Sequence, residues 1–242
     1  SDRFSGTNGV SIPACVARIY AMRHGYAFKL VKNLEYISNR TYGNCTSRHM
    51  SPWNKIPLMA QYLPTVEILV WIDLDAIIQR HELPLSKVLP NQPLESACNY
   101  FPHIKELGSG FIADDPNFFP GAANRTFFWA TLDINPTYAV NVNTAVMALR
   151  RGERAIEFLR YVWEAGKDPQ TFKKHDPKWQ SKQECVGYWG WPWEQGGVWD
   201  VLLDTSRPEF LRESCILPHN GGHALNSVND FWGDTHIHSG RP

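Results

Sequence analysis

Residues 66–72 read VEILVWI, a nearly continuous run of apolar and β-branched side chains. Such a run is typical of a strand that is buried on both faces, as in a parallel sheet covered by helices. Around it, the residue patterns predict helices over 12–24 and 52–63 and a strand over 26–31. This alternation of helix and strand indicates the α/β fold class, with a central, mostly parallel sheet flanked by helices.

The second half of the chain continues the same layout. Helices are predicted over 152–165 and 194–203, and the first of them has apolar residues at the spacing of an amphipathic helix. Strands are predicted over 96–101, 110–113, 143–149 and 214–217. Because no linker, repeat or low-complexity segment interrupts the chain, residues 1–242 are interpreted as one domain.

Charge and hydropathy exclude several classes of protein. Basic and acidic residues number 24 each, so the formal net charge is zero and generic electrostatic binding to nucleic acid is not expected. No apolar run approaches the ~20 residues that cross a bilayer, so attachment to a membrane would need an anchor outside this sequence. The five cysteines are dispersed and lack CxxC pairs, which indicates neither a disulfide scaffold nor a zinc module.

Asp73 and Asp75 directly follow the apolar run and are separated by one residue. In open α/β sheets, ligands bind at the carboxyl ends of the strands. Two such carboxylates repel each other unless a cation lies between them, and oxygen ligands suit Mg²⁺ or Mn²⁺, which also hold a diphosphate. The alternative is a solvated pair that caps the following turn, but the buried strand before the pair favours a metal site.

Three further segments carry candidate site residues. Near the C-terminus, His236 and His238 occupy alternate positions, so both could face a metal, and the alternative is a surface loop with incidental histidines. Glu194 and Gln195 open a predicted helix after a Trp-rich stretch, where a carboxylate and an amide can bind sugar hydroxyls. Asn143 opens an apolar strand and either faces a pocket or belongs to a turn at the strand end.

Six segments resemble, in this order along the chain, the GT-A-fold retaining glycosyltransferases of family 34. These are plant and fungal Golgi enzymes that add α-xylosyl, α-galactosyl or α-mannosyl units. The segments are residues 20–26 (YAMRHGY), 52–58 (PWNKIPL), 71–77 (WIDLDAI), 143–150 (NTAVMALR), 194–195 (EQ) and 233–240 (GDTHIHSG). The resemblance implies transfer of a sugar from a UDP- or GDP-linked donor to a glycan acceptor, with retention of the α-linkage.

The same resemblance implies a metal site. Asp73 and Asp75 match the aspartates that hold Mn²⁺, or Mg²⁺, and through it the diphosphate of the nucleotide sugar. His238 matches the third protein ligand, and His236 is the alternative to it. A divalent ion at this place would neutralise the charge on the leaving nucleoside diphosphate.

Roles in donor binding and catalysis also follow from the resemblance. Lys55 and Arg241 match cationic partners of the donor. Asn143, Glu194 and Gln195 match positions that line the donor sugar and the acceptor. Because Gln195 is an uncharged amide and a poor nucleophile, the expected route is front-face attack, and a covalent intermediate on Glu194 is the alternative.

Two rival functions stay open on the sequence alone. A carbohydrate-binding module would use the Trp-rich stretch 188–199 without any need for a nucleotide. A metal-dependent hydrolase would use the C-terminal histidine cluster, which consists of His219, His223, His236 and His238.

Three N-glycosylation sequons begin at Asn39, Asn44 and Asn124. Together with the resemblance to Golgi enzymes, they predict the lumen of the secretory pathway as the natural setting. A full-length protein without a hydrophobic anchor segment would instead be cytoplasmic.

Overall fold

The computed structural model describes residues 12–31, 51–74, 76–78, 80–89, 126–133, 141–165 and 193–217. Its α-helices are α1 (Ile12–His24), α3 (Lys55–Tyr62), α4 (Leu85–Val88), α6 (Glu153–Ala165), α8 (Trp193–Leu202) and α9 (Pro208–Arg212). Short 3₁₀ turns, η1 (Ser51–Asn54) and η2 (Leu63–Thr65), flank α3. The strands are β1 (Ile68–Ile72), β2 (Phe128–Asp133), β3 (Asn141–Arg150) and β4 (Ser214–Leu217).

The four described strands form one mixed sheet in the order β1-β3-β2-β4. Strand β3 pairs antiparallel with both β1 and β2, and β2 pairs parallel with β4. The α/β class with flanking helices is therefore confirmed, but the described sheet is mixed and not mostly parallel. One reason is that only residues 134–140 join β2 to β3, whereas a parallel crossover needs about a dozen residues or more.

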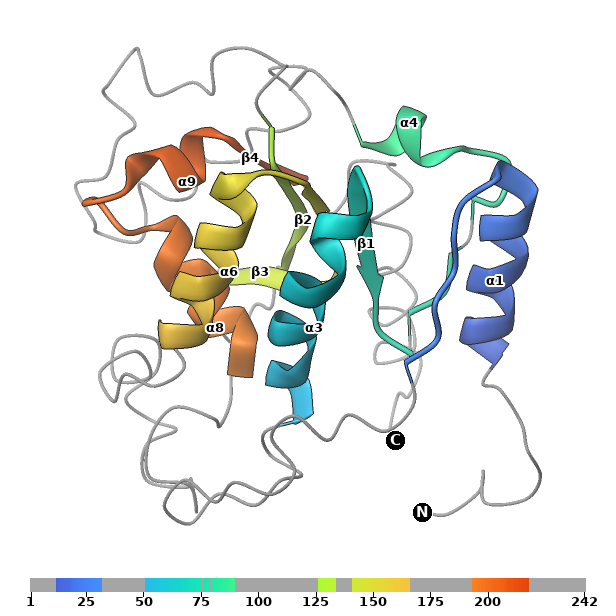
Figure 1. Cartoon of the computed structure of the whole chain (residues 1–242), viewed down its shortest axis with the longest axis horizontal. Coiled ribbons are helices and arrows are strands. Elements are labelled where there is room, and N and C mark those ends of the chain that lie inside the picture. The colour runs from blue at the N-terminus through green and yellow to red at the C-terminus, as the bar shows by residue number, and fades with distance from the viewer. Residues whose placement is uncertain are drawn as a thin grey trace, which may run out of the picture.

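Apolar side chains cover both faces of this sheet. On one face, helices α3, α6, α8 and α9 pack over the strands (Figure 1) and enclose the larger cluster, which includes Trp53, Phe128, Met147 and Phe158. On the other face, a smaller cluster joins Trp129, Ala148 and Leu217 to residues near α4. Both clusters share one sheet, so they are the two sides of a single layered unit.

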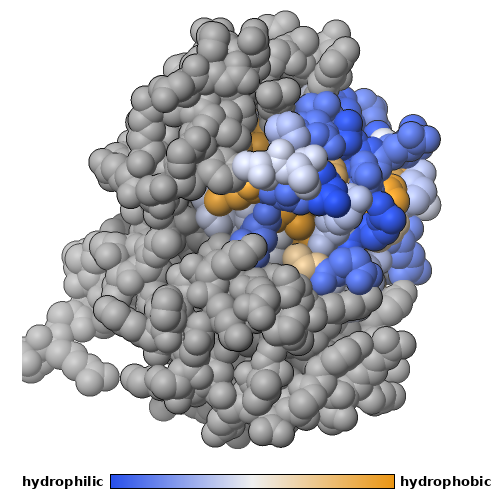
Figure 2. All heavy atoms as spheres, turned by 90° about the vertical axis from the view of Figure 1, so that its left-hand side faces the viewer, coloured by the Kyte–Doolittle hydropathy of each residue, from blue (hydrophilic) through white to orange (hydrophobic). Residues whose placement is uncertain are grey.

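Local patterns explain the main helices. Helix α6 buries Ala155, Phe158, Leu159 and Val162, which recur every three or four residues along one side. The outward side of this region is largely hydrophilic (Figure 2). There the Arg154 guanidinium lies 3.2 Å from Glu209 of α9, which links the two helices at the surface.

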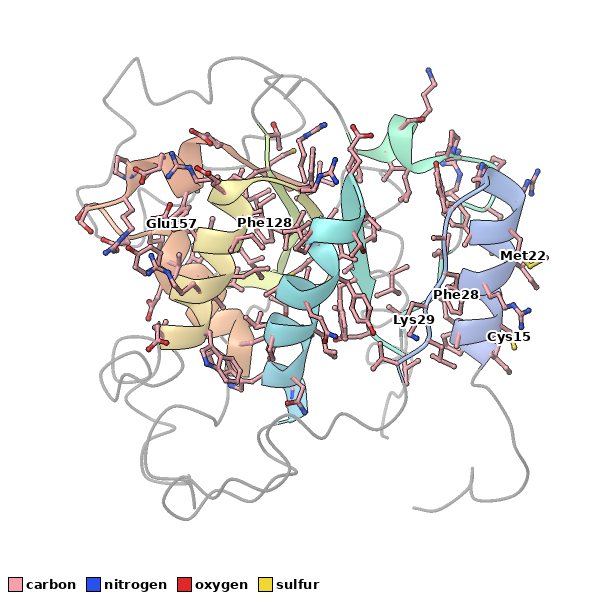
Figure 3. All side chains as sticks on the ribbon, viewed as in Figure 1. Cys15, Met22, Phe28, Lys29, Phe128 and Glu157 are labelled. Atoms are coloured by element: carbon pink, nitrogen blue, oxygen red, sulfur yellow. The ribbon has the colours of Figure 1, made fainter. Side chains whose placement is uncertain are left out.

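Helix α1 ends at His24, and the next residue, Gly25, has a φ of 71°, the left-handed conformation that glycine adopts most easily. The helix buries Ala14, Ala17, Tyr20 and Ala21. Its opposite side, which carries Cys15 and Met22, faces away from the rest of the described chain (Figure 3). The Tyr20 hydroxyl donates to the Leu83 carbonyl at 2.6 Å and so ties α1 to the segment before α4.

Several sequence predictions differ from the structure. Residues 26–31, predicted as a strand, belong to no ladder among the described residues. Strand β1 begins at Ile68 and is half-buried throughout, because in the described sheet it is an outer strand that pairs with β3 alone. Strand β2 and helices α4 and α9 were not predicted, and the strands predicted over 96–101 and 110–113 lie outside the described residues.

The remaining predicted elements are confirmed to within a few residues, namely α1, α3, β3, α6, α8 and β4. Cys15 is a free, exposed thiol, whereas Cys215 on β4 is disulfide-bonded. In the part of the chain that the structure describes, no helix has both the length and the apolar character to cross a bilayer.

Candidate active site

A buried lysine lies at the centre of the candidate site. Lys55 is the first residue of α3, and its side chain is only 4% exposed. Its Nζ lies 2.9 Å from Asp73 Oδ2 and 2.9 Å from Glu194 Oε1. It also donates to the Thr144 carbonyl at 3.2 Å. The ammonium group therefore joins the start of α3 to the residue after β1, to strand β3 and to the first turn of α8.

The coordination of Lys55 accounts for its burial. An ammonium group has three N–H donors, and three acceptors surround this one. Burial alone would lower the pKa of Lys55, but the negative charges of Glu194 and Asp73 outweigh it and raise the pKa above its ordinary value. The lysine thus stays charged, and a buried charge that lost either partner would be strongly destabilising.

Asp73 is placed by the end of the β1–β3 ladder. Its backbone N–H donates to the Ala145 carbonyl at 2.8 Å, and its own carbonyl accepts from the Ala76 N–H at 3.0 Å, where the chain turns. The Trp71 indole Nε1 donates to Asp73 Oδ1 at 2.5 Å, and Lys55 binds the other oxygen. Burial nevertheless raises the pKa of Asp73, with Lys55 and Trp71 opposing that effect.

Glu194 is the most enclosed carboxylate of the cluster, with a side chain only 3% exposed. Its Oε1 accepts a 2.6 Å hydrogen bond from the Thr144 hydroxyl and faces Lys55. Its Oε2 is buried and, within the described part of the chain, has no hydrogen-bond partner. Its place in the first turn of α8 is favourable for an acidic residue, because the helix dipole is positive at that end. Gln195, the next residue, is half-buried.

An irregularity in the sheet directs Thr144 toward this site. Trp129 pairs with Ala148, but Thr131 pairs with Asn143, so the register between β2 and β3 shifts between these two pairs. As a result Val142 lies in the cluster under the helices, whereas Val146 lies in the cluster on the opposite face. Such irregularities are known to re-aim side chains near functional sites. Simple alternation along β3 would not place Thr144 beside Glu194.

The structure brings together part of the predicted set of site residues. Asp73, Lys55 and Glu194 meet directly, and Asn143 is adjacent in sequence to Thr144. The Asn143 Oδ1 accepts from the Ala145 N–H at 2.8 Å, the local contact typical of a turn or strand-end residue. Gln195 follows Glu194 in α8, and the remaining predicted site residues lie outside the described residues, namely Asp75, His236, His238 and Arg241.

Two residues of the cluster were not predicted as site residues. Thr144 belongs to the polar pair that opens an otherwise apolar strand, which is a weak signal for it. Trp71 gives no polar signal, since it stands in the apolar run, and only its indole N–H reaches the site.

The described residues are compatible with one ligand of a divalent cation. Asp73 uses two of the roughly four acceptor positions of a carboxylate, and its side chain is 30% exposed. The three side-chain charges of Lys55, Asp73 and Glu194 sum to one net negative charge, which would attract a cation. The described residues contain no group of three potential metal-ligating side chains.

Comparison with known proteins identifies the family. The model of the galactosyl transferase GMA12/MNN10 family matches residues 17–188, most of the chain, and the chain therefore belongs to this family of glycosyltransferases. This confirms the family that the sequence resembles, and the matched range covers the first four of the six segments, while residues 194–195 and 233–240 lie beyond it.

Two individual proteins are similar to this chain. An alpha-1,2-galactosyltransferase of Schizosaccharomyces pombe (strain 972 / ATCC 24843) is 30% identical over 101 residues, which cover 40% of this chain and 25% of that relative. The match therefore spans about a quarter of the relative's length. A crystal structure of a glycosyltransferase involved in the glycosylation of the major capsid of PBCV-1 is 15% identical, with a TM-score of 0.39, and covers 90% of this chain and 92% of that one.

Proposed function

We propose that this chain is the catalytic domain, over residues 1–242, of a metal-dependent retaining glycosyltransferase with the GT-A fold. It would move a sugar from a nucleotide-sugar donor to a hydroxyl group of a glycan and form an α-linkage. Membership of the family supports the class of reaction. The observation that carries the proposal is the Lys55 cluster, because it joins two carboxylates, Asp73 and Glu194, that the family resemblance assigns to the donor diphosphate and to the sugar.

The donor side of the proposed site lies at the end of β1. Asp73 would hold Mn²⁺ or Mg²⁺ together with Asp75 and His238, or with His236 in its place. A bound divalent ion would neutralise charge on the leaving diphosphate. The family resemblance assigns Arg241 and Lys55 to the donor as cationic partners, and the structure shows Lys55 to be buried.

The environment of Glu194 supports front-face attack as the route to retention. A nucleophile must reach the anomeric carbon, but the Glu194 carboxylate is almost fully enclosed, and its Oε1 is bound to Lys55 and Thr144. Gln195 is less buried and follows it on the same helix turn. We assign to the Gln195 amide oxygen the stabilisation of positive charge that develops on the donor sugar.

The described tryptophans do not favour a carbohydrate-binding module. Trp53, Trp129 and Trp199 are buried in the two clusters, and the partly buried Trp71 and Trp163 pack against the larger one. Buried indole rings stabilise a core and present no stacking surface to a sugar. The histidines of the rival hydrolase all lie outside the described residues.

We place the protein in the lumen of the secretory pathway, in the Golgi. The disulfide bond of Cys215 supports this setting, because disulfides form and persist in oxidising compartments. The three sequons at Asn39, Asn44 and Asn124 point the same way.

A thermal-shift screen tests the donor assignment. UDP-galactose, UDP-xylose and GDP-mannose would each be added with and without Mn²⁺, because a ligand of the native state raises the unfolding temperature by mass action. One donor, or its nucleoside diphosphate, should stabilise the protein in the presence of Mn²⁺ and much less in the presence of a chelator. Equal stabilisation by free glycans without nucleotide would instead indicate a carbohydrate-binding module.

A further inference from the structure

The contacts of Lys55 point to a role that differs from binding the donor. We propose that Lys55 is a positioning residue, which holds Asp73 at the end of β1 and Glu194 at the start of α8 at a fixed spacing. This proposal relies on the proposed function only in that Asp73 lies in the donor site. The Asp73–Lys55–Glu194 contacts, called the clamp from here on, are present in the protein without any ligand.

All three hydrogen-bond donors of the Lys55 ammonium group are already used. Its three N–H groups have three acceptors within 3.2 Å, namely Asp73, Glu194 and the Thr144 carbonyl. Its side chain is only 4% exposed. A phosphate oxygen could bind Nζ only by displacing one of these partners, and displacing a carboxylate would leave a buried charge without its counter-charge.

The geometry also shows why the two carboxylates need Lys55. Each lies 2.9 Å from the same nitrogen, so without the cation two negative charges would face each other in a largely buried site. Lys55 compensates the negative charge of Glu194 through Oε1 alone, because Glu194 Oε2 has no hydrogen-bond partner among the described residues. Loss of Lys55 would therefore drive the end of β1 and the first turn of α8 apart.

Gln195 links this spacing to catalysis. It follows Glu194 in α8, so the position of its amide relative to Asp73 depends on the Asp73–Lys55–Glu194 contacts. Misplacement of a reacting group by about 1 Å can lower turnover roughly 10²-fold. Lys55 would then act on the reaction through its neighbours without touching the donor.

The Trp71 indole offers a signal that reports on the clamp without any ligand. Its N–H donates to Asp73, whereas the Glu194 carboxylate contacts Lys55 and Thr144. In ¹H–¹⁵N spectra, with the signal assigned by Trp71→Phe, Glu194→Gln should shift the Trp71 indole proton. The reason is that Asp73 would then be the only carboxylate paired with Lys55. Lys55 would draw negative charge toward itself within the Asp73 carboxylate, and the hydrogen bond from the Trp71 indole to Asp73 would weaken.

Two threonines give a matched pair of variants. Thr144→Val removes the hydroxyl that holds Glu194 and should shift the Trp71 signal in the same direction by a smaller amount. Thr131→Val removes a buried hydroxyl that has no hydrogen-bond partner within the described structure, and it should leave the signal unchanged. The two substitutions are chemically identical, so a general effect of lost hydroxyls is controlled.

Binding of UDP and GDP in the presence of Mn²⁺, measured by calorimetry, distinguishes a positioning role of Lys55 from direct binding of the nucleotide by Lys55. The clamp predicts that Lys55→Arg keeps nucleotide affinity and part of the turnover, and that Lys55→Met and Glu194→Gln lower turnover non-additively. An unshifted Trp71 signal in Glu194→Gln, with nucleotide affinity lost only in Lys55→Met, would overturn it. If Lys55→Met does not fold, the Trp71 signal in the Glu194→Gln and Thr144→Val variants still tests the clamp. A wild type that binds neither nucleotide would refute the proposed function, while the Trp71 signal would still test the clamp.

Discussion

Helix α8 packs so closely on η1 that a single methyl group should disturb the site. A Cβ atom built on Gly197 would lie 2.7 Å from Cη2 and 3.3 Å from Cζ3 of the Trp53 ring, and 3.4 Å from the Val162 carbonyl oxygen. Carbon atoms prefer separations of about 3.5–4.0 Å, so the nearest contact is too short by roughly 1 Å. Trp53 is fully buried, so its ring could make room only by moving against the core that surrounds it.

Two opposing terms determine the effect of Gly197→Ala on stability. Alanine is favoured over glycine inside a helix by about 1 kcal/mol. Overpacking of a filled core costs about 1–3 kcal/mol. We expect the second term to win, so the free energy of unfolding, measured by urea denaturation, should fall by up to about 2 kcal/mol. Turnover should also fall, because the same helix carries Glu194 and Gln195.

Two controls make this prediction refutable. Gly152→Ala places its methyl group where no atom lies within 4 Å, and it should change stability by less than about 0.5 kcal/mol. Trp53→Phe removes the ring atoms that a new methyl group would meet, so the loss in the double variant should be smaller than the sum of the two single losses. A Gly197→Ala protein that is more stable than wild type by about 1 kcal/mol would show that helix propensity alone decides and that the packing argument is wrong.

Two further predictions concern the amide beside Glu194 and the tyrosine of α1. Gln195→Ala should lower turnover by roughly 10²-fold with little change in donor affinity, whereas a sugar trapped on Glu194, detected by mass spectrometry, would contradict front-face attack. Burial, with a smaller effect of Tyr26, raises the pKa of Tyr20 from 10.0 to about 12. The unfolded chain then loses this proton at lower pH than the folded chain, so stability is retained below pH 10 and falls between pH 10 and 12. Tyr20→Phe should remove that part of the pH dependence in thermal unfolding experiments.

Local sequence patterns predicted the helices and strands that are determined by residues close together in the sequence. Helix α6 shows this best, because its buried residues follow the helical period regardless of what covers them. A strand also depends on the strands with which it pairs, and the local sequence does not identify them. Residues 26–31 have strand-forming side chains but no ladder in the described structure, and β2 was missed although it pairs with both β3 and β4.

The candidate site was predicted as separate residues but not as a network. The position of Asp73 after an apolar strand and of Glu194 at a helix start made each a candidate. The ion pairs through Lys55 bring together residues that are distant in sequence, which no local pattern reveals. Thr144 was missed because the shift of register in β3 turns its side chain to the face that simple alternation would not assign.

The most direct test of the proposed function is a transfer assay with an aspartate variant. Wild-type protein would be incubated with nucleotide sugars, Mn²⁺ and oligosaccharide acceptors, beside Asp75→Ala and the control Glu67→Ala. The Glu67 side chain is 79% exposed and stands just before β1, so its removal should leave transfer unchanged. We predict an α-linked product, identified by NMR, that requires Mn²⁺ and is lost in Asp75→Ala while that variant unfolds as wild type does. A folded Asp75→Ala protein that keeps most of the activity would contradict the metal assignment, and failure of the wild type to consume any donor would contradict the transferase proposal.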